Sequence, residues 1–460
     1  MGKNEKARIG DSAIYDARQL GIPKMLILGL QHMFAMFGAT VLVPILISGY
    51  GLPLSIQTTL LFAGIGTLLF HVLTKFKVPA FLGSSFAFLG GFATIANLNT
   101  GKFADMSGAD KLPYALGGVV IAGLLYLVLA LVIKLVGVKR VLHFIPPVVT
   151  GPIIILIGLT LAPNAINDSS TNWWLAILAL GTIIAINIFA KGMIKIIPIL
   201  LGIVVPYVVA LIITLAGGPD LVKFAGVADA SVVGLQQFVF PKFDINTILI
   251  MAPIAIATMM EHVGDMSAIS ATVGKNYLSD PGLHRSLIGD GIATALAGMF
   301  GGPANTTYGE NTGVLVLTKV YDPKVVRIAA GFAILLSFSP AFAQIIHSIP
   351  TAIIGGVSFI LYGMISAIGV RNVIENKVDF TRTRNLIITA VIFVSGLGFK
   401  IWGYSNEFQG LTFKIGEANI TLTSLAIAAI LGIILNAVLP GNDYEFGKSQ
   451  QGDSSVNFEL

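Results

Sequence analysis

Cysteine is absent from all 460 residues of this chain. Without thiols the protein has no disulfide framework, no thiolate nucleophile and no cysteine-ligated metal. Charge is also scarce, because only 11% of the residues are charged, whereas about 25% are charged in soluble domains. Together with 55% hydrophobic residues and a mean hydropathy of +0.86, this scarcity excludes an ordinary soluble domain and predicts an all-α polytopic membrane protein.

Signatures of catalysis are missing as well. The sequence has no nucleotide-binding P-loop, no HExxH zinc motif and no plausible order of Ser, His and Asp on a common loop. Its six histidines are too scattered to predict a metal site. We therefore expect no catalytic residues, no metal and no organic cofactor, and the chain is not predicted to be an enzyme.

The charge that is present is mainly positive. A net charge of +5 and a pI near 9.2 would also suit a protein that binds nucleic acid. Membrane proteins, however, collect Lys and Arg in their cytoplasmic loops. The expected partner is therefore the lipid bilayer and not nucleic acid.

Long apolar runs recur along the chain, each of about 17 to 25 residues, which suits a bilayer core of about 30 Å. Fourteen candidate spans lie near residues 24–47, 55–74, 79–99, 113–136, 145–163, 173–190, 193–216, 246–272, 286–301, 304–318, 325–346, 350–370, 385–400 and 420–440.

The loop charges test this count. If the N-terminus is cytoplasmic and successive loops alternate sides, 22 of the 28 Lys and Arg residues fall in the cytoplasm. Residues 1–24 are polar and basic and do not resemble a cleavable signal peptide. We therefore expect fourteen spans in the cytoplasmic (inner or plasma) membrane, with both termini in the cytoplasm.

The second half of the sequence echoes the first at a distance of seven spans. An odd number of spans for each repeat inverts the second copy relative to the membrane, which is the common construction of secondary transporters. The matching pairs are Ile145-Pro146-x4-Gly151 with Ile349-Pro350-x4-Gly355, Gln31-His32 with Glu261-His262, and Pro79-Ala80 with Pro303-Ala304.

Spans three and ten are interrupted at equivalent places. Span ten opens with Gly301-Gly302-Pro303 and provides only about 22 Å of helix before Lys319, too little to cross a bilayer core. We expect residues 305–308 to be extended, and Gly83-Ser84-Ser85-Phe86 gives span three the same character. Interrupted spans in equivalent positions of two halves indicate a transporter binding site.

Polar groups gather at the interruption in span ten, where residues 304–313 bring a carboxylate, an amide and four hydroxyls into an apolar region. Lipid cannot satisfy such groups, so they must face a protein-lined cavity. A channel would need a continuous polar pore instead, and the polar residues here cluster at mid-depth. The pattern therefore favours a carrier with its site between the repeats.

Four acidic residues lie within predicted spans: Glu261, Asp265, Asp290 and Glu310. Glu261 and Asp265 are four apart and share one helix face, with His262 one position off it. They suit substrate binding and proton relay, because a carboxyl group near its protonation point is what proton coupling requires. The competing interpretation is that buried acids are bonded to the backbone for packing, and a structural role is favoured for Asp290.

Two further residues have both a functional and a structural interpretation. His32 could carry a proton or be a hydrogen-bonded core histidine. Phe86 occupies the position of Glu310 when Pro79-Ala80 is laid over Pro303-Ala304, and it could stack on a planar ligand or simply pack.

These motifs resemble those of the nucleobase-ascorbate transporters, the nucleobase:cation symporter-2 family. The family signature of Gln, Glu or Pro followed by Asn-x-Gly-x4-Thr and Arg, Lys or Gly is matched by Glu310-Asn311-Thr312-Gly313-x4-Thr318-Lys319. Supporting stretches are Leu30 to Thr40, Gly83 to Phe88, Glu261-His262-Val263-Gly264, Asp280 to Arg285, Asn305 to Asn311 and Leu361-Tyr362-Gly363. Glu before Asn-x-Gly is similar to the uracil carriers, whereas purine and ascorbate members usually have Gln.

The resemblance implies a seven-plus-seven inverted repeat in which a core domain moves against a gate domain. The core would comprise residues 24–140 and 245–348, the gate residues 141–244 and 349–440, and the cytoplasmic tails residues 1–23 and 441–460. Proton symport of uracil and a homodimer are also implied.

Residue roles follow from the same resemblance. Glu261 and Glu310 would hydrogen-bond the uracil ring, and Phe86 would pack against it. The remaining site residues would be Ala39 and Gly309, through backbone groups, with Ser85, Tyr308 and Tyr362 lining the site. Proton coupling would involve Glu261, Asp265, Glu310, His32 and Asn311.

One residue departs from the pattern. The best-known uracil carrier has a histidine four residues after the first glutamate, whereas this chain has Asp265, similar to purine-transporting relatives. A xanthine or purine:proton symporter therefore remains the alternative within the family.

Overall fold

The computed structural model describes residues 13–99, 101–191, 194–195, 197–222, 226–227, 230–405, 410–415 and 418–441. Apolar helices dominate, as predicted, and four short strands form two antiparallel pairs. The first half contains η1 (Ala17–Leu20), α1 (Ile22–Gly49), α2 (Ile56–Leu73), β1 (Leu82–Ser84), η2 (Phe86–Phe88), α3 (Leu89–Ala96), η3 (Gly101–Phe103), α4 (Gly108–Val136), α5 (Val138–Phe144), α6 (Pro147–Ser170), α7 (Trp173–Phe189) and α8 (Pro198–Leu215). The second half contains α9 (Ile245–Met251), α10 (Ile254–Val273), η5 (Leu278–Gly282), α11 (Leu283–Met299), β2 (Asn305–Thr307), α12 (Gly309–Thr318), α13 (Pro323–Ser337), α14 (Pro340–His347), α15 (Thr351–Glu375), α16 (Thr383–Ser405), β3 (Gly410–Ile415), β4 (Ala418–Thr423) and α17 (Ser424–Val438).

Membrane-spanning length is reached by eight helical segments in the described part of the chain, or by nine if α13 and α14 count together. Shorter apolar helices account for other predicted spans, including Trp173–Phe189 and Ser424–Val438. The multi-span class is therefore confirmed, and the count of fourteen stays a prediction.

Span 246–272 is confirmed as one segment of spanning length, Ile245–Val273, although its helix is interrupted at Ala252 and Pro253, where Pro253 lacks the N–H that a continuous helix would use. Two other predicted spans are not continuous helices. Span 325–346 bends by 87° between α13 and α14, close to Pro340. Span 420–440 begins as strand β4, which pairs with β3 in a hairpin that the apolar pattern did not predict.

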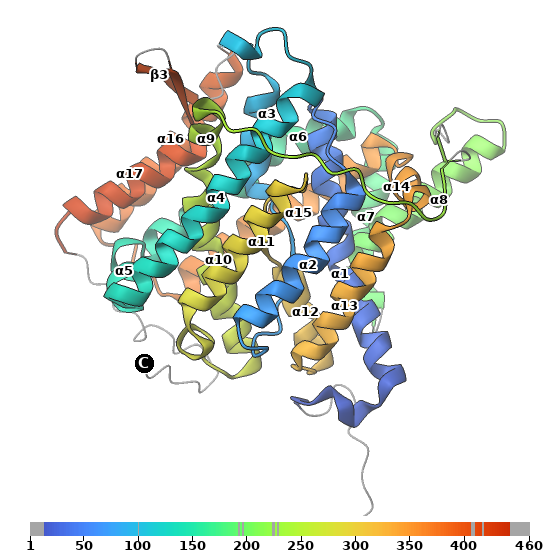
Figure 1. Ribbon diagram of the computed structural model, residues 1–460, viewed down its shortest axis with the longest axis horizontal. Coiled ribbons are helices and arrows are strands. Elements are labelled where there is room, and N and C mark those ends of the chain that lie inside the picture. The colour runs from blue at the N-terminus through green and yellow to red at the C-terminus, as the bar shows by residue number, and fades with distance from the viewer. Residues whose placement is uncertain are drawn as a thin grey trace, which may run out of the picture.

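The helices are arranged in two packed groups. Figure 1 shows α4, α11, α2 and α13 side by side, and α1 packs against α13. In the other group α15 packs against α6 and α7, α7 against α8, and α16 against α6 and α17. Contacts of α10 with α6 and α17, and of α1 with α8, join the groups.

Glycine permits the closest helix contacts in each group. A Cβ on Gly123 of α4 would lie 2.6 Å from Ala295 N of α11, and one on Gly291 would lie 2.6 Å from Gly123 O. Between α6 and α15, a Cβ on Gly369 would lie 2.7 Å from Gly151 O. Small residues at such crossings let backbones approach where lipid provides no hydrophobic drive for association.

Candidate functional site

Two interrupted segments from opposite halves of the chain meet inside the helical bundle. Strand β1 pairs antiparallel with β2, so that Gly83 lies opposite Thr306. The ladder extends on both sides, since Ser85 N donates to Ala304 O at 2.8 Å and Tyr308 N donates to Phe81 O at 2.9 Å. The extended stretches predicted in spans three and ten are confirmed, and their antiparallel pairing is the relation that an inverted repeat predicts.

A helical segment begins just beyond each strand. Helix α12 starts at Gly309, and η2 leads into α3 from Phe86. Neither start has a side-chain cap hydrogen bond. Three strand residues span about 10 Å, so the two helix N-termini, each with free backbone donors and a positive dipole end, lie at the two ends of the paired strands.

A buried carboxylate is hydrogen-bonded to the paired strands β1 and β2, which we call the strand crossing. Asp265 of α10 is 8% exposed, and its Oδ2 accepts a hydrogen bond from Thr307 Oγ1 at 3.0 Å. A Cβ placed on Gly309 would lie 3.9 Å from Asp265 Oδ1, so the start of α12 adjoins the same carboxylate. Glu261 lies one turn earlier on α10 and is partly exposed. The structure thus brings Asp265 and Gly309 together, with Glu261 on the same helix as Asp265.

Glu310 occupies the second position of α12, beside Gly309. Its side chain lies outside the described part of the structure. The role predicted for that carboxylate stays a prediction, and only the position of its backbone at the helix start is established.

Aromatic rings line one side of the crossing. Phe86 and Tyr362 of α15 are 7% and 2% exposed, and their ring centroids lie 6.1 Å apart in an edge-on arrangement. This contact links the segment after β1 to a helix of the other packed group. The pairing suits a site that covers one face of a planar ligand.

His32 and Asn311 form a second buried contact. Asn311 Nδ2 lies 3.2 Å from His32 Nδ1 and donates to His32 O at 3.0 Å. Because the amide donates, Nδ1 of His32 is the acceptor in this arrangement. The contact joins α1, which also carries the buried Ala39, to the first turn of α12.

Tyr308 braces the crossing through its hydroxyl group. Its OH donates to Ser84 O at 2.8 Å, and Ser84 Oγ donates to Thr40 O at 2.8 Å. The predicted role of Tyr308 as a lining residue stays a prediction, but the structure shows it holding β1, β2 and α1 in register.

Several buried polar atoms around the crossing have no hydrogen-bond partner among the described residues. They include Ser85 Oγ, Thr306 Oγ1 and Asn311 Oδ1. Buried polar atoms are rarely left unpaired, so an unpaired group calls for a water, an ion or a ligand. Their concentration here supports a polar ligand.

Sequence reasoning missed the pairing of His262 with Asp290. His262 Nδ1 lies 3.1 Å from Asp290 Oδ2, and its Nε2 lies 2.9 Å from Ser286 Oγ, with the side chains of His262 and Asp290 fully buried. The signal was present, because an intramembrane Asp needs a partner and His262 lies off the face shared by Glu261 and Asp265. This pair joins α10 to α11 and supports the structural role predicted for Asp290.

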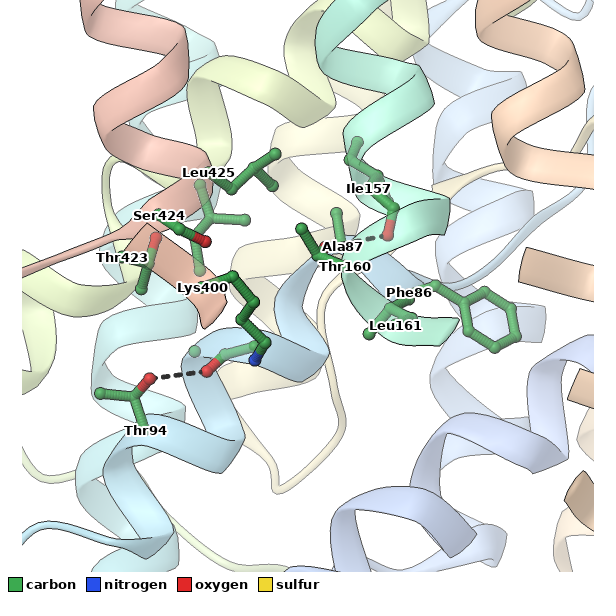
Figure 2. Close-up of a pocket in the computed structure, with 13 residues that line it drawn as sticks. Phe86, Ala87, Thr94, Ile157, Thr160, Leu161, Lys400, Thr423, Ser424 and Leu425 are labelled. Carbon is green, nitrogen blue, oxygen red and sulfur yellow. Dashed lines mark hydrogen bonds between the residues drawn. The ribbon is translucent and has the colours of Figure 1, made fainter. Parts of the chain in front are cut away.

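Lys400, at the end of the predicted span 385–400, is half-buried and lines a pocket beside Phe86. The pocket lies where η2 and α3 face α6, α16 and α17. Figure 2 shows Phe86 at one end, its ring turned away from Lys400, Thr423 and Ser424. The pocket therefore follows the boundary between the two packed groups.

Gly83→Ala provides a test of the crossing. A Cβ on Gly83 would lie 2.5 Å from the Tyr308 ring and 2.7 Å from Thr40 Oγ1, both held in the interior. Overpacking of this kind costs about 1–3 kcal/mol, so we expect lower thermal stability and loss of ligand binding. Gly90→Ala is the matched control, because a Cβ there meets nothing within 4 Å. Normal binding in purified Gly83→Ala would show that the strands need not pack this closely.

Solved structures share this fold. The transmembrane domain of the cyanobacterial bicarbonate transporter BicA aligns over 92% of this chain and 98% of its own, with a TM-score of 0.57 and 16% identity. SLC26A9 aligns over 92% of this chain and 66% of its own, with a TM-score of 0.61 and 12% identity. Crossed, interrupted segments in such a bundle, with a buried carboxylate and unpaired polar groups around them, define a membrane transporter.

Sequence comparison identifies the family of transporters to which the chain belongs. The model of a family described as "Permease family" (Xan_ur_permease) matches residues 23–403. The uracil permease of Bacillus caldolyticus is 42% identical over 429 residues, covering 90% of this chain and 91% of its own, and that of Bacillus subtilis (strain 168) is 38% identical over 450 residues, covering 94% and 95%. The putative pyrimidine permease RutG of Escherichia coli (strain K12) is 37% identical over 417 residues, covering 90% and 89%. The chain belongs to this permease family, and the relatives named here are permeases and not enzymes.

Proposed function

We propose that this protein is a proton-coupled uracil symporter that imports the nucleobase across the cytoplasmic membrane by alternating access. The observation that carries the proposal is 42% identity to a uracil permease over 90% of the chain. Uracil is planar and neutral, with N–H donors beside C=O acceptors. A carboxylate, the backbone donors of two helix N-termini and an aromatic ring near the strand pair can match that edge and cover that face.

Proton coupling is supported by the carboxyl groups at the crossing. Asp265 is buried and hydrogen-bonded to Thr307, which ends β2 two residues before the start of α12. A substrate that binds at this strand pair therefore touches a segment already bonded to a protonatable group. Substrate binding and protonation of Asp265 can then be linked without a cofactor or a metal.

Alternating access is supported by the division into two packed groups. We propose that the core comprises residues 24–140 and 245–348 and that the gate comprises residues 141–244 and 349–440. The pocket beside Phe86 lies between elements of both. We further propose fourteen spans, both termini in the cytoplasm and a homodimer.

Uptake into proteoliposomes tests the function. We expect labelled uracil to accumulate under an inward proton gradient without sodium, and we expect counterflow and saturation, which a channel would not show. Accumulation that continues in sodium after the proton gradient has collapsed would contradict proton coupling. Recovery of chemically altered uracil would contradict transport without catalysis.

Competition of xanthine, guanine and thymine with labelled uracil distinguishes a uracil symporter from a purine symporter. The aspartate at position 265, a residue type similar to that of purine-transporting relatives, is the feature that favours a xanthine or purine:proton symporter. Stronger competition by xanthine than by unlabelled uracil would establish that alternative.

A further inference from the structure

The segment just before α1 crosses the ends of three other helices. Ile14 pairs with Val320 in a parallel bridge, with Ile14 N donating to Lys319 O at 2.8 Å and Tyr321 N donating to Ile14 O at 2.8 Å. Ile14 and Val320 are 3% and 0% exposed and belong to a small apolar cluster that is separate from the main core. The other buried members of this small cluster are Ala17, Leu20, Leu28 and Val325. We call residues 14–20 the N-terminal strap.

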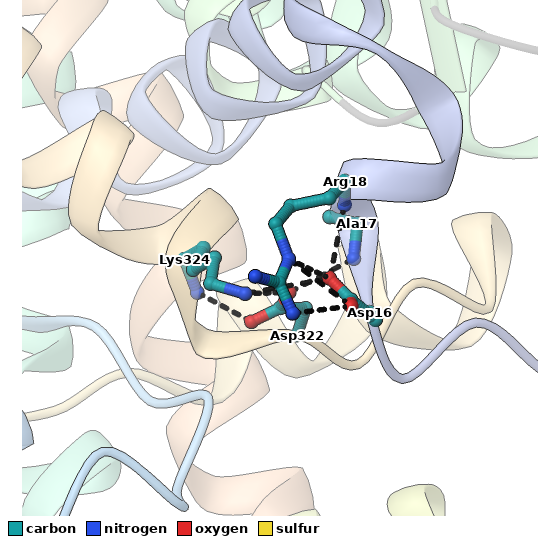
Figure 3. Close-up of polar contacts among 5 residues, drawn as sticks. All are labelled: Asp16, Ala17, Arg18, Asp322 and Lys324. Carbon is teal, nitrogen blue, oxygen red and sulfur yellow. Dashed lines mark hydrogen bonds and ion pairs between the residues drawn. The ribbon is translucent and has the colours of Figure 1, made fainter.

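A buried carboxylate fixes the strap to the start of α13. Asp322 is 5% exposed; its Oδ2 accepts from Ala17 N at 2.8 Å, and its Oδ1 accepts from Lys324 N at 3.0 Å. Figure 3 shows Lys324 reaching between Asp322 and Asp16, at 3.4 and 3.3 Å. Asp322 therefore caps α13 and holds the strap with the same side chain.

The Asp16–Arg18 pair lies at the surface. Their side chains are 36% and 73% exposed and lie 2.8 Å apart. Hydrogen bonds from Arg18 hold the pKa of Asp16 well below its usual range, so Asp16 stays ionised at neutral pH. An exposed pair of this kind contributes little to stability, and it provides a control position.

Tyr15 connects the strap to α10. Its OH donates to Val273 O, at the last residue of α10, at 2.9 Å. The ring lies 5.5 Å from the ring of Tyr321 and 4.5 Å from Lys275 Nζ. The strap thus holds the end of α10 beside the segment that follows α12.

The strap contacts and the strand crossing lie at opposite ends of the same two helices, α10 and α12. Helix α12 has ten residues, about 15 Å, and it begins at the strand crossing and ends at Lys319. Asp265 precedes Val273 by eight residues, about 12 Å along α10. At the site, the Thr307–Asp265 bond joins α10 to β2, two residues before α12, and the strap joins the other ends of α10 and α12.

We propose that the N-terminal strap sets the spacing of α10 and α12 and so positions the substrate site, with Tyr15 and Asp322 as positioning residues. The start of α12 is held by the strand pair and by the contact of Asn311 with His32, and its far end at Lys319 is held by the strap. Loss of the strap would let the first turn of α12 shift relative to Asp265. Substrate affinity would fall, whereas the turnover of bound substrate would be retained.

Tyr15→Phe is the first test, because it removes the hydroxyl bond to Val273 and keeps the ring contacts. We expect KM and Kd for uracil to rise about three- to ten-fold, the effect of one hydrogen bond, with kcat within about two-fold of wild type. Asp322→Ala should have a larger effect, and Asp322→Asn, which retains one acceptor oxygen, should rescue part of it. Arg18→Gln should leave all values unchanged.

Hydrogen exchange of the α12 amides supplies a readout that needs no ligand. We expect exchange across Gly309–Thr318 to be faster in Tyr15→Phe and in Asp322→Ala than in wild type and Arg18→Gln. The uracil measurements depend on the proposed function, and failure of the wild-type protein to bind uracil would overturn that function and leave the exchange result as the test of the strap. Unchanged exchange in α12, or a lower melting temperature with unchanged Kd and KM in a wild-type protein that binds uracil, would overturn the positioning role.

Discussion

Glu310→Gln is expected to abolish high-affinity uracil binding. The residue lies in the first turn of α12, beside Gly309 and the strand crossing, and the family resemblance gives its carboxylate a hydrogen bond to the uracil ring. A hydrogen bond to a charged group contributes about 1.5–3 kcal/mol, which corresponds to roughly a 10- to 150-fold change in Kd. The amide also presents a donor where an acceptor is needed, which adds to the loss. Binding to the purified protein, measured by calorimetry or by scintillation proximity, checks this result.

Asp105→Asn is the matched control for this change. It makes the same neutralisation at an exposed turn between η3 and α4, and uracil affinity should be unaffected. Wild-type affinity in Glu310→Gln would remove Glu310 from the site. A switch of preference toward xanthine, with uracil lost, would instead show that this position selects the nucleobase.

Asp265→Asn is expected to uncouple transport from the proton gradient. The substitution keeps the size of the side chain and an oxygen that can accept from Thr307 Oγ1, now 3.0 Å from Oδ2, but it removes the group that can take up a proton. Uracil should therefore still bind, with Kd within about ten-fold of wild type, the loss of about one ordinary hydrogen bond. Accumulation above equilibrium should be lost, whereas exchange of internal for external uracil should persist.

Thr307→Val tests the Thr307–Asp265 hydrogen bond separately from the protonation of Asp265. It removes the hydroxyl donor and leaves the carboxyl group of Asp265, so coupling should survive with reduced affinity. Simultaneous measurement of uracil and proton fluxes in proteoliposomes distinguishes the two variants. If Asp265→Asn loses binding while the protons carried per uracil stay unchanged, the relay role belongs to another residue.

Much of the architecture followed from the sequence because the bilayer restricts what a chain can do. Apolar runs and loop charges predicted a multi-span helical protein, and Pro303 with the Thr-rich stretch that follows predicted the extended segment at residues 305–308. The bend between α13 and α14 and the hairpin of β3 and β4 did not follow, because their composition is as apolar as that of a continuous span. Hydropathy alone cannot distinguish a short strand from part of a membrane helix.

Within the site, sequence spacing placed Glu261 and Asp265 on one face of α10 and separated them from His262. Spacing within a helix is local, so it survives folding unchanged. The partners of these residues are distant in sequence: Thr307 for Asp265, Asp290 for His262 and Asn311 for His32. No local pattern specifies such pairs.

The sequence by itself determined that this protein is a multi-span helical membrane protein, and it predicted a polar centre at residues 304–313, because lipid cannot solvate polar groups and every such group must be enclosed. Only the tertiary structure decided how that centre is held. The antiparallel register of β1 and β2, the hydroxyl of Tyr308 on Ser84 and the strap at Asp322 all depend on segments hundreds of residues apart meeting in space. Their contacts arise from packing and hydrogen bonding across the whole fold, which local composition does not encode.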